Sequence, residues 1–139
     1  MTIKQLSIFI ENKSGTLIKV LNMLSKAGIQ IIASTLADTK DYGIFRVLCD
    51  NPAQAYMLLK EGGINVQLSD VIALSIDDTP GCAAKAIDKI SASGVNILYL
   101  YSFLWKGKGV LVFRTDDNTK ANETIMINKM DFLTEMDFK

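Results

Sequence analysis

Residues 15–50 read GTLIKVLNMLSKAGIQIIASTLADTKDYGIFRVLCD, and residues 81–116 read GCAAKAIDKISASGVNILYLYSFLWKGKGVLVFRTD. The two stretches align without a gap at an offset of 66 residues (81 − 15), so no loop between their shared landmarks changes length. This regularity predicts a tandem repeat in which both halves have the same fold. The landmark pairs are Gly15 and Gly81, Gly28 and Gly94, Ile31 and Ile97, Gly43 and Gly109, and Asp50 and Asp116.

The first repeat has the periodicities of a βαββαβ unit. Apolar residues alternate over 5–10, which predicts a strand, and the polar residues 12–15 then favour a cap for the helix that follows. From Leu17 to Leu24 the apolar residues recur at helical spacing, and Gly28 is expected to end this helix. Strands are expected over 29–37 and 42–49. A second helix is expected between the Asn51 cap and Gly62, and a last strand over 64–68.

The second repeat goes through the same steps. The pattern predicts a strand over 72–76, a helix with an apolar face from Ala83 to Ile90, and a hairpin of 96–105 with 109–115. A weak helical face follows over 118–129, and residues 130–138 are expected to form the last strand. The predicted class is therefore α+β, with two tandem ferredoxin-like units, residues 1–68 and 69–139, and antiparallel sheets. Each half is about the size of the smallest independent domains, so we expect the halves to pack together.

Composition excludes several classes of function. The 139 residues are 49% hydrophobic and 22% charged, with 15 basic and 15 acidic side chains, which favours a soluble globular protein and argues against nucleic-acid or membrane partners. Histidine is absent, so neither a catalytic triad nor an ordinary zinc site is expected, and no metal or cofactor is predicted. Two isolated cysteines, no signal peptide and no apolar membrane-spanning stretch favour the cytoplasm.

The turn after the first strand of each repeat is the most informative motif. Asn12-Lys13-Ser14-Gly15-Thr16-Leu17 and Asp78-Thr79-Pro80-Gly81-Cys82-Ala83 resemble the ligand loop of the ACT family of small regulatory domains. The segments Gly28-Ile29-Gln30-Ile31 and Gly94-Val95-Asn96-Ile97 are similar to the family's passage from the first helix into the second strand. The resemblance covers nearly the whole chain, twice. It implies a regulatory protein that is not an enzyme.

In ACT domains an amino acid binds where the loop of one domain meets the second strand and first helix of its neighbour. A helix N-terminus suits the α-carboxylate, a glycine lets the ligand approach the backbone, and Asn12 or Asp78 could accept hydrogen bonds from the ammonium group. The resemblance therefore implies fourteen ligand-binding candidates: Asn12, Ser14, Gly15, Thr16, Leu17, Gln30, Ile31, Asp78, Pro80, Gly81, Cys82, Ala83, Asn96 and Ile97.

Several of these residues also have a structural explanation. Asn12, Ser14 and Asp78 are common helix caps, and Pro80 is favoured near a helix start. Cys82 is either a reactive thiol at a helix N-terminus or a small core residue. The neutral Asn12 matches the anionic Asp78 in the repeat, and a charge-assisted hydrogen bond is about twice as strong as a neutral one, so we expect two unequal sites.

Aromatic residues and the absence of a further domain suggest partners. The residues Tyr99, Tyr101, Phe103 and Trp105 share one face of a strand while leucines occupy the other, which favours a homodimer unless the aromatic side chains are buried within one chain. The repeats fill the sequence, so we expect the regulated protein to be a separate metabolic enzyme or regulator. The alternative is a scaffold with vestigial ligand loops. An RNA-binding module is less favoured, because Lys108 and Val110 occupy the positions where base-stacking aromatics would stand.

Overall fold

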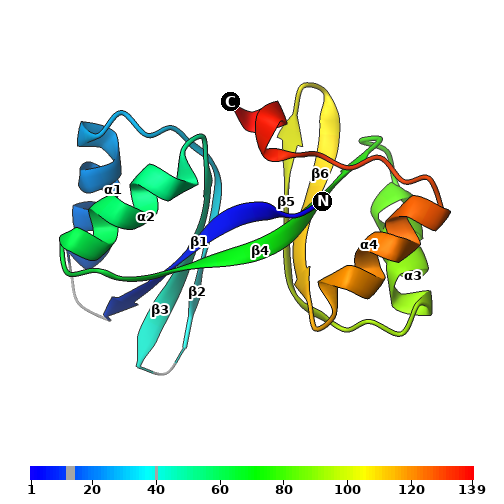
Figure 1. The fold of residues 1–139 in the computed structure, drawn as a ribbon, viewed down its shortest axis with the longest axis horizontal. Coiled ribbons are helices and arrows are strands. Elements are labelled where there is room, and N and C mark those ends of the chain that lie inside the picture. The colour runs from blue at the N-terminus through cyan, green and yellow to red at the C-terminus, as the bar shows by residue number, and fades with distance from the viewer. Residues whose placement is uncertain (12–14, 40) are drawn as a thin grey trace. The chain divides into compact units, whose positions relative to one another are not determined.

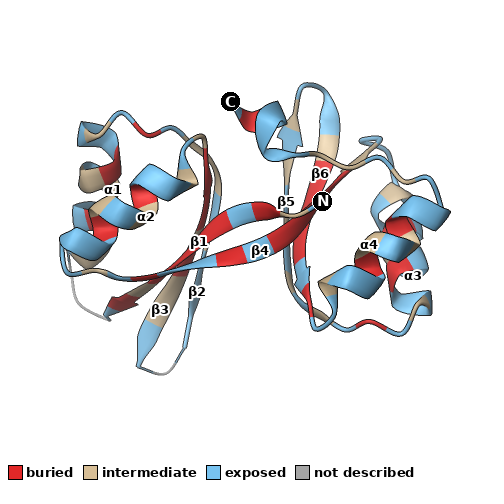
Figure 2. Ribbon diagram, in the orientation of Figure 1, coloured by how far each residue is buried: buried red, intermediate tan, exposed pale blue. Residues whose placement is uncertain are grey.

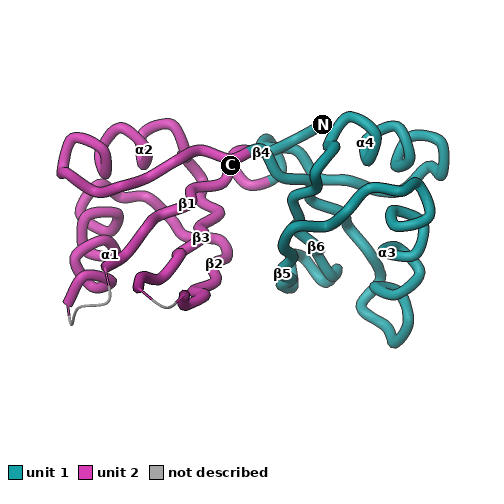
Figure 3. The backbone as a smooth tube through the Cα atoms, turned by 90° about the horizontal axis from the view of Figure 1, so that it is seen from below, with its two compact units in different colours: residues 1–3, 70–137 teal, residues 4–69, 138–139 magenta. Residues whose placement is uncertain are grey.

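The chain forms two compact units, and the residues at each end of the chain belong to the unit formed mainly by the other half of the sequence. The structure is a computed structural model that describes residues 1–11, 15–39 and 41–139. Unit 1 consists of Met1–Ile3 and Asp70–Asp137, and unit 2 of Lys4–Ser69 and Phe138–Lys139 (Figure 3). Each unit has an apolar core of its own, which confirms the predicted α+β class with ferredoxin-like repeats.

Unit 2 has the element order βαββαβ of the first repeat. Its elements are β1 (Ile3–Glu11), α1 (Thr16–Lys26), β2 (Ile31–Asp38), β3 (Tyr42–Cys49), α2 (Pro52–Glu61) and the first part of β4 (Asn65–Ile76) (Figure 1). The strand order is β2-β3-β1-β4, and β3 is antiparallel to both β1 and β2. Both helices lie on one face of these strands (Figure 3). Leu6 and Ile8 of β1 and Leu24 and Leu59 of the helices are fully buried in the core that forms there.

Unit 1 has the corresponding elements up to its second helix. The later part of β4 is followed by α3 (Cys82–Ala92), β5 (Ile97–Trp105), β6 (Lys108–Thr115) and α4 (Asn118–Ile127), with the strand order β4-β6-β5. Buried residues of β4, β6 and the two helices form one core cluster, and the buried stretches of these elements are red in Figure 2. Ile72, Phe113, Ile90 and Ile125 are fully buried there. The helix expected from the weak helical face over 118–129 is α4.

The prediction that residues 130–138 form the last strand of the second repeat is wrong. This segment makes a single bridge from Phe132 to Leu74 and then the 3-10 helix η1 (Glu135–Phe138). The carboxylate of Asp137 accepts hydrogen bonds from the backbone N–H and hydroxyl of Thr134, at 2.7 and 3.2 Å. Such a local side-chain cap starts a helical turn and competes with strand pairing. The strands expected separately over 64–68 and 72–76 are also a single strand, β4.

The first helix of each repeat begins at a glycine; the expected cap residues Asn12 and Ser14 of the first repeat lie outside the described residues. The N-cap residues of α1 and α3 are Gly15 (φ 92°) and Gly81 (φ 90°), and neither glycine position has a side-chain cap among the described residues. Both glycines have left-handed backbone angles, which L-residues other than Asn and Asp rarely adopt. The cap predicted at Asn51 is confirmed, because its side chain accepts a hydrogen bond from the N–H of Gln54 at 3.2 Å. The loops before α1 and α3 are therefore built on glycine geometry.

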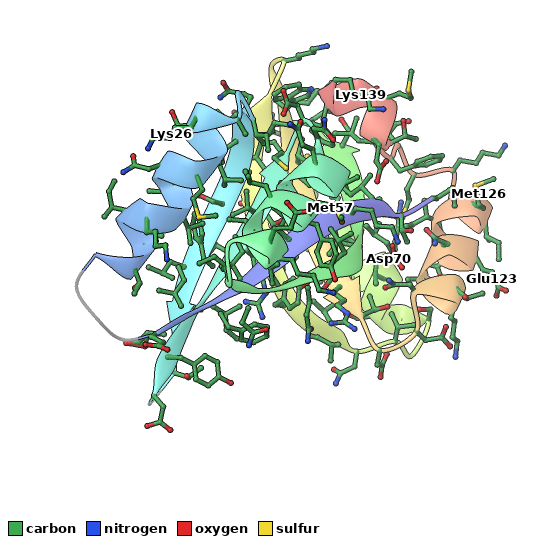
Figure 4. The ribbon with its side chains drawn as sticks, turned by 60° about the vertical axis from the view of Figure 1, so that its left-hand side comes forward. Lys26, Met57, Asp70, Glu123, Met126 and Lys139 are labelled. Carbon is green, nitrogen blue, oxygen red and sulfur yellow. The ribbon has the colours of Figure 1, made fainter. Side chains whose placement is uncertain are left out.

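The two faces of β5 are covered to different extents. The aromatic residues of this strand are partly buried, whereas Leu98, Leu100 and Leu104 are 53%, 42% and 66% exposed. Leu100 lies opposite the buried Phe113 in the β5–β6 register, so both side chains are on the face of the sheet that carries the helices. Strand β5 is at the edge of the sheet, and Leu100 stays exposed there. Other exposed apolar side chains point outward from the helices, among them Met57 of α2 and Met126 of α4 (Figure 4).

Candidate functional site

The loop between β4 and α3 is the part of unit 1 whose geometry suits a small ligand. The backbone N–H of Cys82 donates to the carbonyl of Thr79 at 3.3 Å, and the N–H of Lys85 to the carbonyl of Gly81 at 3.0 Å. In the described part of the chain, no backbone acceptor is recorded for the N–H groups of Ala83 and Ala84. An uncapped helix N-terminus has free donors and a positive partial charge, which favour a carboxylate.

A cavity of about 390 Å³ opens beside this loop. Asp78, Pro80, Gly81 and Ala83, which were all predicted site residues, lie in its wall. The opposite wall is formed by residues of the β5–β6 hairpin: Ser102, Phe103, Leu104, Gly109, Val110 and Leu111. A Cβ atom at Gly81 would meet no heavy atom within 4 Å, so the backbone is open to a ligand at this point. The cavity thus combines backbone donors with a mainly apolar wall.

Two carboxylates at this loop have different surroundings. Asp77 makes an ion pair with Lys108 at 2.5 Å. The hydrogen bond and opposite charge lower the pKa of Asp77 and raise the pKa of Lys108. Asp78 is exposed, and no hydrogen bond or ion pair joins its side chain to a described residue. Asp77 therefore helps to hold the end of the hairpin near the loop, while the carboxylate of Asp78 is available to a cationic group.

The candidates at the start of the second strand lie elsewhere. The backbone N–H of Asn96 donates to the carboxylate of Asp116 at 2.9 Å, and the N–H of Asp116 donates back to the carbonyl of Asn96 at 3.0 Å. The same pair of bonds joins Gln30 and Asp50 at 3.0 and 3.1 Å. These bonds fix the entry into β5 and β2. The matching aspartates were visible in the repeat alignment, but their role as backbone clamps was not predicted.

In each unit the ligand loop and the second-strand segment lie at opposite ends of one helix. Helix α1 has 11 residues, which span about 16 Å at 1.5 Å per residue. Gly15 precedes this helix and Gln30 follows it, and Gly81 and Asn96 are related in the same way across α3. Neither unit alone brings the two sets of candidates together.

The remaining candidates have mixed surroundings. Leu17, Ile31 and Ile97 are partly buried and pack against the cores of their units. The hydroxyl of Thr16 donates to the carbonyl of Glu11 at 3.0 Å, and Thr16 lines a separate cavity of unit 2. Asn12 and Ser14 lie outside the described residues.

The two cysteines are both free but differ in accessibility. Cys82 is partly buried, and its sulfur lies 2.9 Å from the hydroxyl of Thr79. Cys49 is buried on β3, and burial raises its pKa to about 11, which suits a structural thiol. Among the described residues, no group of His, Cys, Asp and Glu could hold a metal ion. None of the helices in the described part of the chain is long and apolar enough to cross a bilayer.

Comparison with protein families agrees with this architecture. The family model described as an ACT domain pair matches residues 1–139. The chain belongs to this family of ACT domain pairs. The resemblance of the two loops and second-strand segments to the ACT family is therefore confirmed over the whole chain.

Solved structures extend the comparison. A crystal structure of a protein from Bacteroides thetaiotaomicron is similar to this ACT pair with 38% sequence identity and a TM-score of 0.93, covering 99% of this chain and 96% of that one. The ligand-free regulatory subunit of aspartate kinase from Thermus thermophilus has a TM-score of 0.62 at 16% identity, covering 89% of this chain and 91% of that one. The corresponding subunit from Thermus flavus has a TM-score of 0.60 at 19% identity, covering 89% and 90%. A search of curated proteins found no match.

Proposed function

We propose that this ACT pair is a regulatory protein that binds an α-amino acid at the loop of residues 77–81 and thereby changes its affinity for a separate protein. The cavity beside the loop carries this proposal. The free N–H groups at the start of α3 suit an α-carboxylate, the unpartnered Asp78 suits the ammonium group, and Phe103 and Leu104 offer apolar surface to the side chain. All three groups of an amino acid thus have a complement in one cavity.

The second-strand segment of the family's binding site would come from a second copy of the chain. Gln30 and Asn96 lie about one helix length from the loop of their own unit, so a neighbouring ACT unit has to supply such a segment. The exposed leucines 98, 100 and 104 offer apolar surface for association. We therefore expect a homodimer, and a sedimentation mass equal to one chain at micromolar concentration would contradict this expectation.

Regulation would follow from differential affinity. An amino acid that binds one arrangement of the ACT units more tightly than another shifts the population toward it, by a coupling free energy of about 1–3 kcal/mol. A partner enzyme or regulator that recognises this arrangement would then gain or lose affinity. In this role the protein needs no catalytic residues of its own.

A thermal-shift screen against the twenty amino acids tests the ligand. Ligand at one hundred times Kd stabilises the folded state by about 2.7 kcal/mol, which corresponds to a rise in Tm of about 10 °C. We expect one or a few amino acids to raise Tm, and Asp78→Ala to abolish the rise. Asp88→Ala is the matched control, because it removes an exposed carboxylate of α3 outside the cavity wall. The absence of any shift would favour the scaffold alternative.

Calorimetry with the identified amino acid tests whether the two loops are equal. The unit 2 loop has Asn12 where unit 1 has the anionic Asp78, so we expect weaker or no binding there. Two identical sites per chain would contradict this expectation.

A further inference from the structure

A second cavity occurs at equivalent positions of both repeats, and in unit 1 it shares only Ile76 and Asp77 with the wall of the amino-acid cavity. In unit 2 it is lined by ten residues from the end of β1, the start of α1, β3, the turn after α2 and the start of β4. Adding 66 to each of these residue numbers gives ten of the thirteen residues that line a cavity of unit 1. The cavities have volumes of about 620 and 260 Å³. The fold therefore forms this cavity twice, from different side chains.

The two copies differ in charge. The unit 2 cavity has one basic and one acidic side chain in its wall, Lys19 and Glu11. The unit 1 cavity has four lysines and two aspartates. Its charged residues are Lys85, Lys89, Lys108, Lys129, Asp77 and Asp131. One copy is thus electrically balanced, and the other has an excess of positive charge.

The two aspartates of the cavity wall offset only part of this positive charge. Lys108 is paired with Asp77 at 2.5 Å. Among the described residues, no ion pair or hydrogen bond is recorded for the side chains of Lys85, Lys89 and Lys129. Lys85 and Lys89 are four residues apart on α3, where like charges repel each other on one helix face. An anion between the three lysines would remove this repulsion.

The backbone at Lys129 adds to the argument. This lysine has a left-handed backbone conformation, with φ 52°. The equivalent residue of unit 2 is Gly63, which has φ 80°. A lysine in this conformation is less stable than glycine, yet a lysine is the residue that lines the cavity at this position. The unit 2 counterparts of Lys108 and Lys89 are likewise uncharged, Tyr42 and Met23.

We propose that the unit 1 cavity binds a compact anion with two or more negative charges, of the phosphoryl or polycarboxylate class. Lysine ammonium groups bind phosphate as point charges, and three unpaired lysines suit a multivalent anion better than a single carboxylate. The volume of about 260 Å³ lies below the range of cavities for drug-sized ligands, so the anion is small. Asp131 lies in the same wall, and its carboxylate repels negative charge nearby. A ligand with negative charge on every side is therefore disfavoured.

Titration of the full chain with inorganic pyrophosphate at low ionic strength, followed by amide chemical shifts, tests the proposal. We expect shifts at residues 85, 89 and 129–131, and weaker binding at higher salt because exposed charges are screened. Lys85→Gln and Lys129→Gly should each weaken binding by about two- to fivefold, as expected for exposed ion pairs. Citrate is the second probe, and the tighter of the two binders identifies the phosphoryl or the polycarboxylate class.

Lys19→Gln is the matched control, because it removes the lysine equivalent to Lys85 from the balanced cavity. Lys129→Gly should also raise Tm in the absence of anion by removing the left-handed lysine, so weaker binding cannot be attributed to unfolding. An absence of shifts at millimolar pyrophosphate, or an equal loss of affinity in Lys19→Gln, would overturn the proposal. Asp78→Ala should leave pyrophosphate binding intact, which separates this site from the amino-acid loop.

Discussion

Replacement of Gly81 by alanine isolates the conformational cost of the ligand loop. Gly81 has φ 90°, and a Cβ atom there would meet no heavy atom within 4 Å, so the substitution adds strain without a steric clash. A left-handed backbone costs an L-residue about 1–2 kcal/mol. Reduced freedom of the unfolded chain offsets about 0.4–1 kcal/mol of this cost. We therefore expect Gly81→Ala to lower the free energy of unfolding by about 1 kcal/mol.

Urea unfolding followed by circular dichroism measures this change, and the corresponding fall in Tm is about 4 °C. Gly15→Ala is the matched variant, because Gly15 has φ 92° and equally open surroundings, and we expect the same loss. Gly81→Asn should cost less, since asparagine tolerates left-handed angles. A Gly81→Ala protein as stable as the wild type, or an equal loss with asparagine, would refute the assignment of the cost to backbone strain. Ligand-induced shifts in Gly81 variants have to be measured from each variant's own ligand-free Tm.

Three further predictions concern charge, thiols and packing. Lys108 lowers the pKa of Asp77. The stability from their pair is therefore present above the ordinary carboxyl pKa of about 3.9 and is lost as pH falls through the lowered value. Carbon-13 titration should show a higher Asp77 pKa in Lys108→Met. A thiol reagent at neutral pH should modify Cys82 in the folded protein and Cys49 only after unfolding, and equal rates would contradict the burial of Cys49. Phe113→Ala should cost about 3–5 kcal/mol in urea unfolding, because this side chain is fully buried, and a loss below 1 kcal/mol would be inconsistent with its place in the core.

The order of helices and strands could be predicted because local periodicity and turn residues determine it. Strand β3 was expected over 42–49, and it forms at Tyr42–Cys49. The expectation failed where a local interaction competed with pairing, as at Thr134 and Asp137. It also failed where no glycine or proline interrupts the chain, because residues 67–71 continue as part of β4 instead of ending one strand and starting another.

The candidate site could be predicted only in part. Its loop was found because the motifs around Gly15 and Gly81 recur in the two repeats and resemble the ACT ligand loop. Its opposite wall was not, because Phe103 and Leu104 reach the loop through strand pairing between distant segments, which sequence spacing does not specify. The lysine-lined cavity was missed because its lysines are scattered between α3, β6 and the segment after α4. Alignment of the repeats would have revealed it, since Lys129 stands where the first repeat has a glycine.

Trp105 provides an optical label for half of the molecule. It is the single tryptophan of the chain, and it ends β5 of unit 1 with the ammonium nitrogen of Lys106 5.7 Å from its ring centroid. Its fluorescence therefore reports the environment of unit 1, whereas far-ultraviolet circular dichroism sums the helices and strands of both units. Coincident denaturation curves from the two signals would mean that the units lose their structure together, and separated curves would assign each transition to its unit without any added dye.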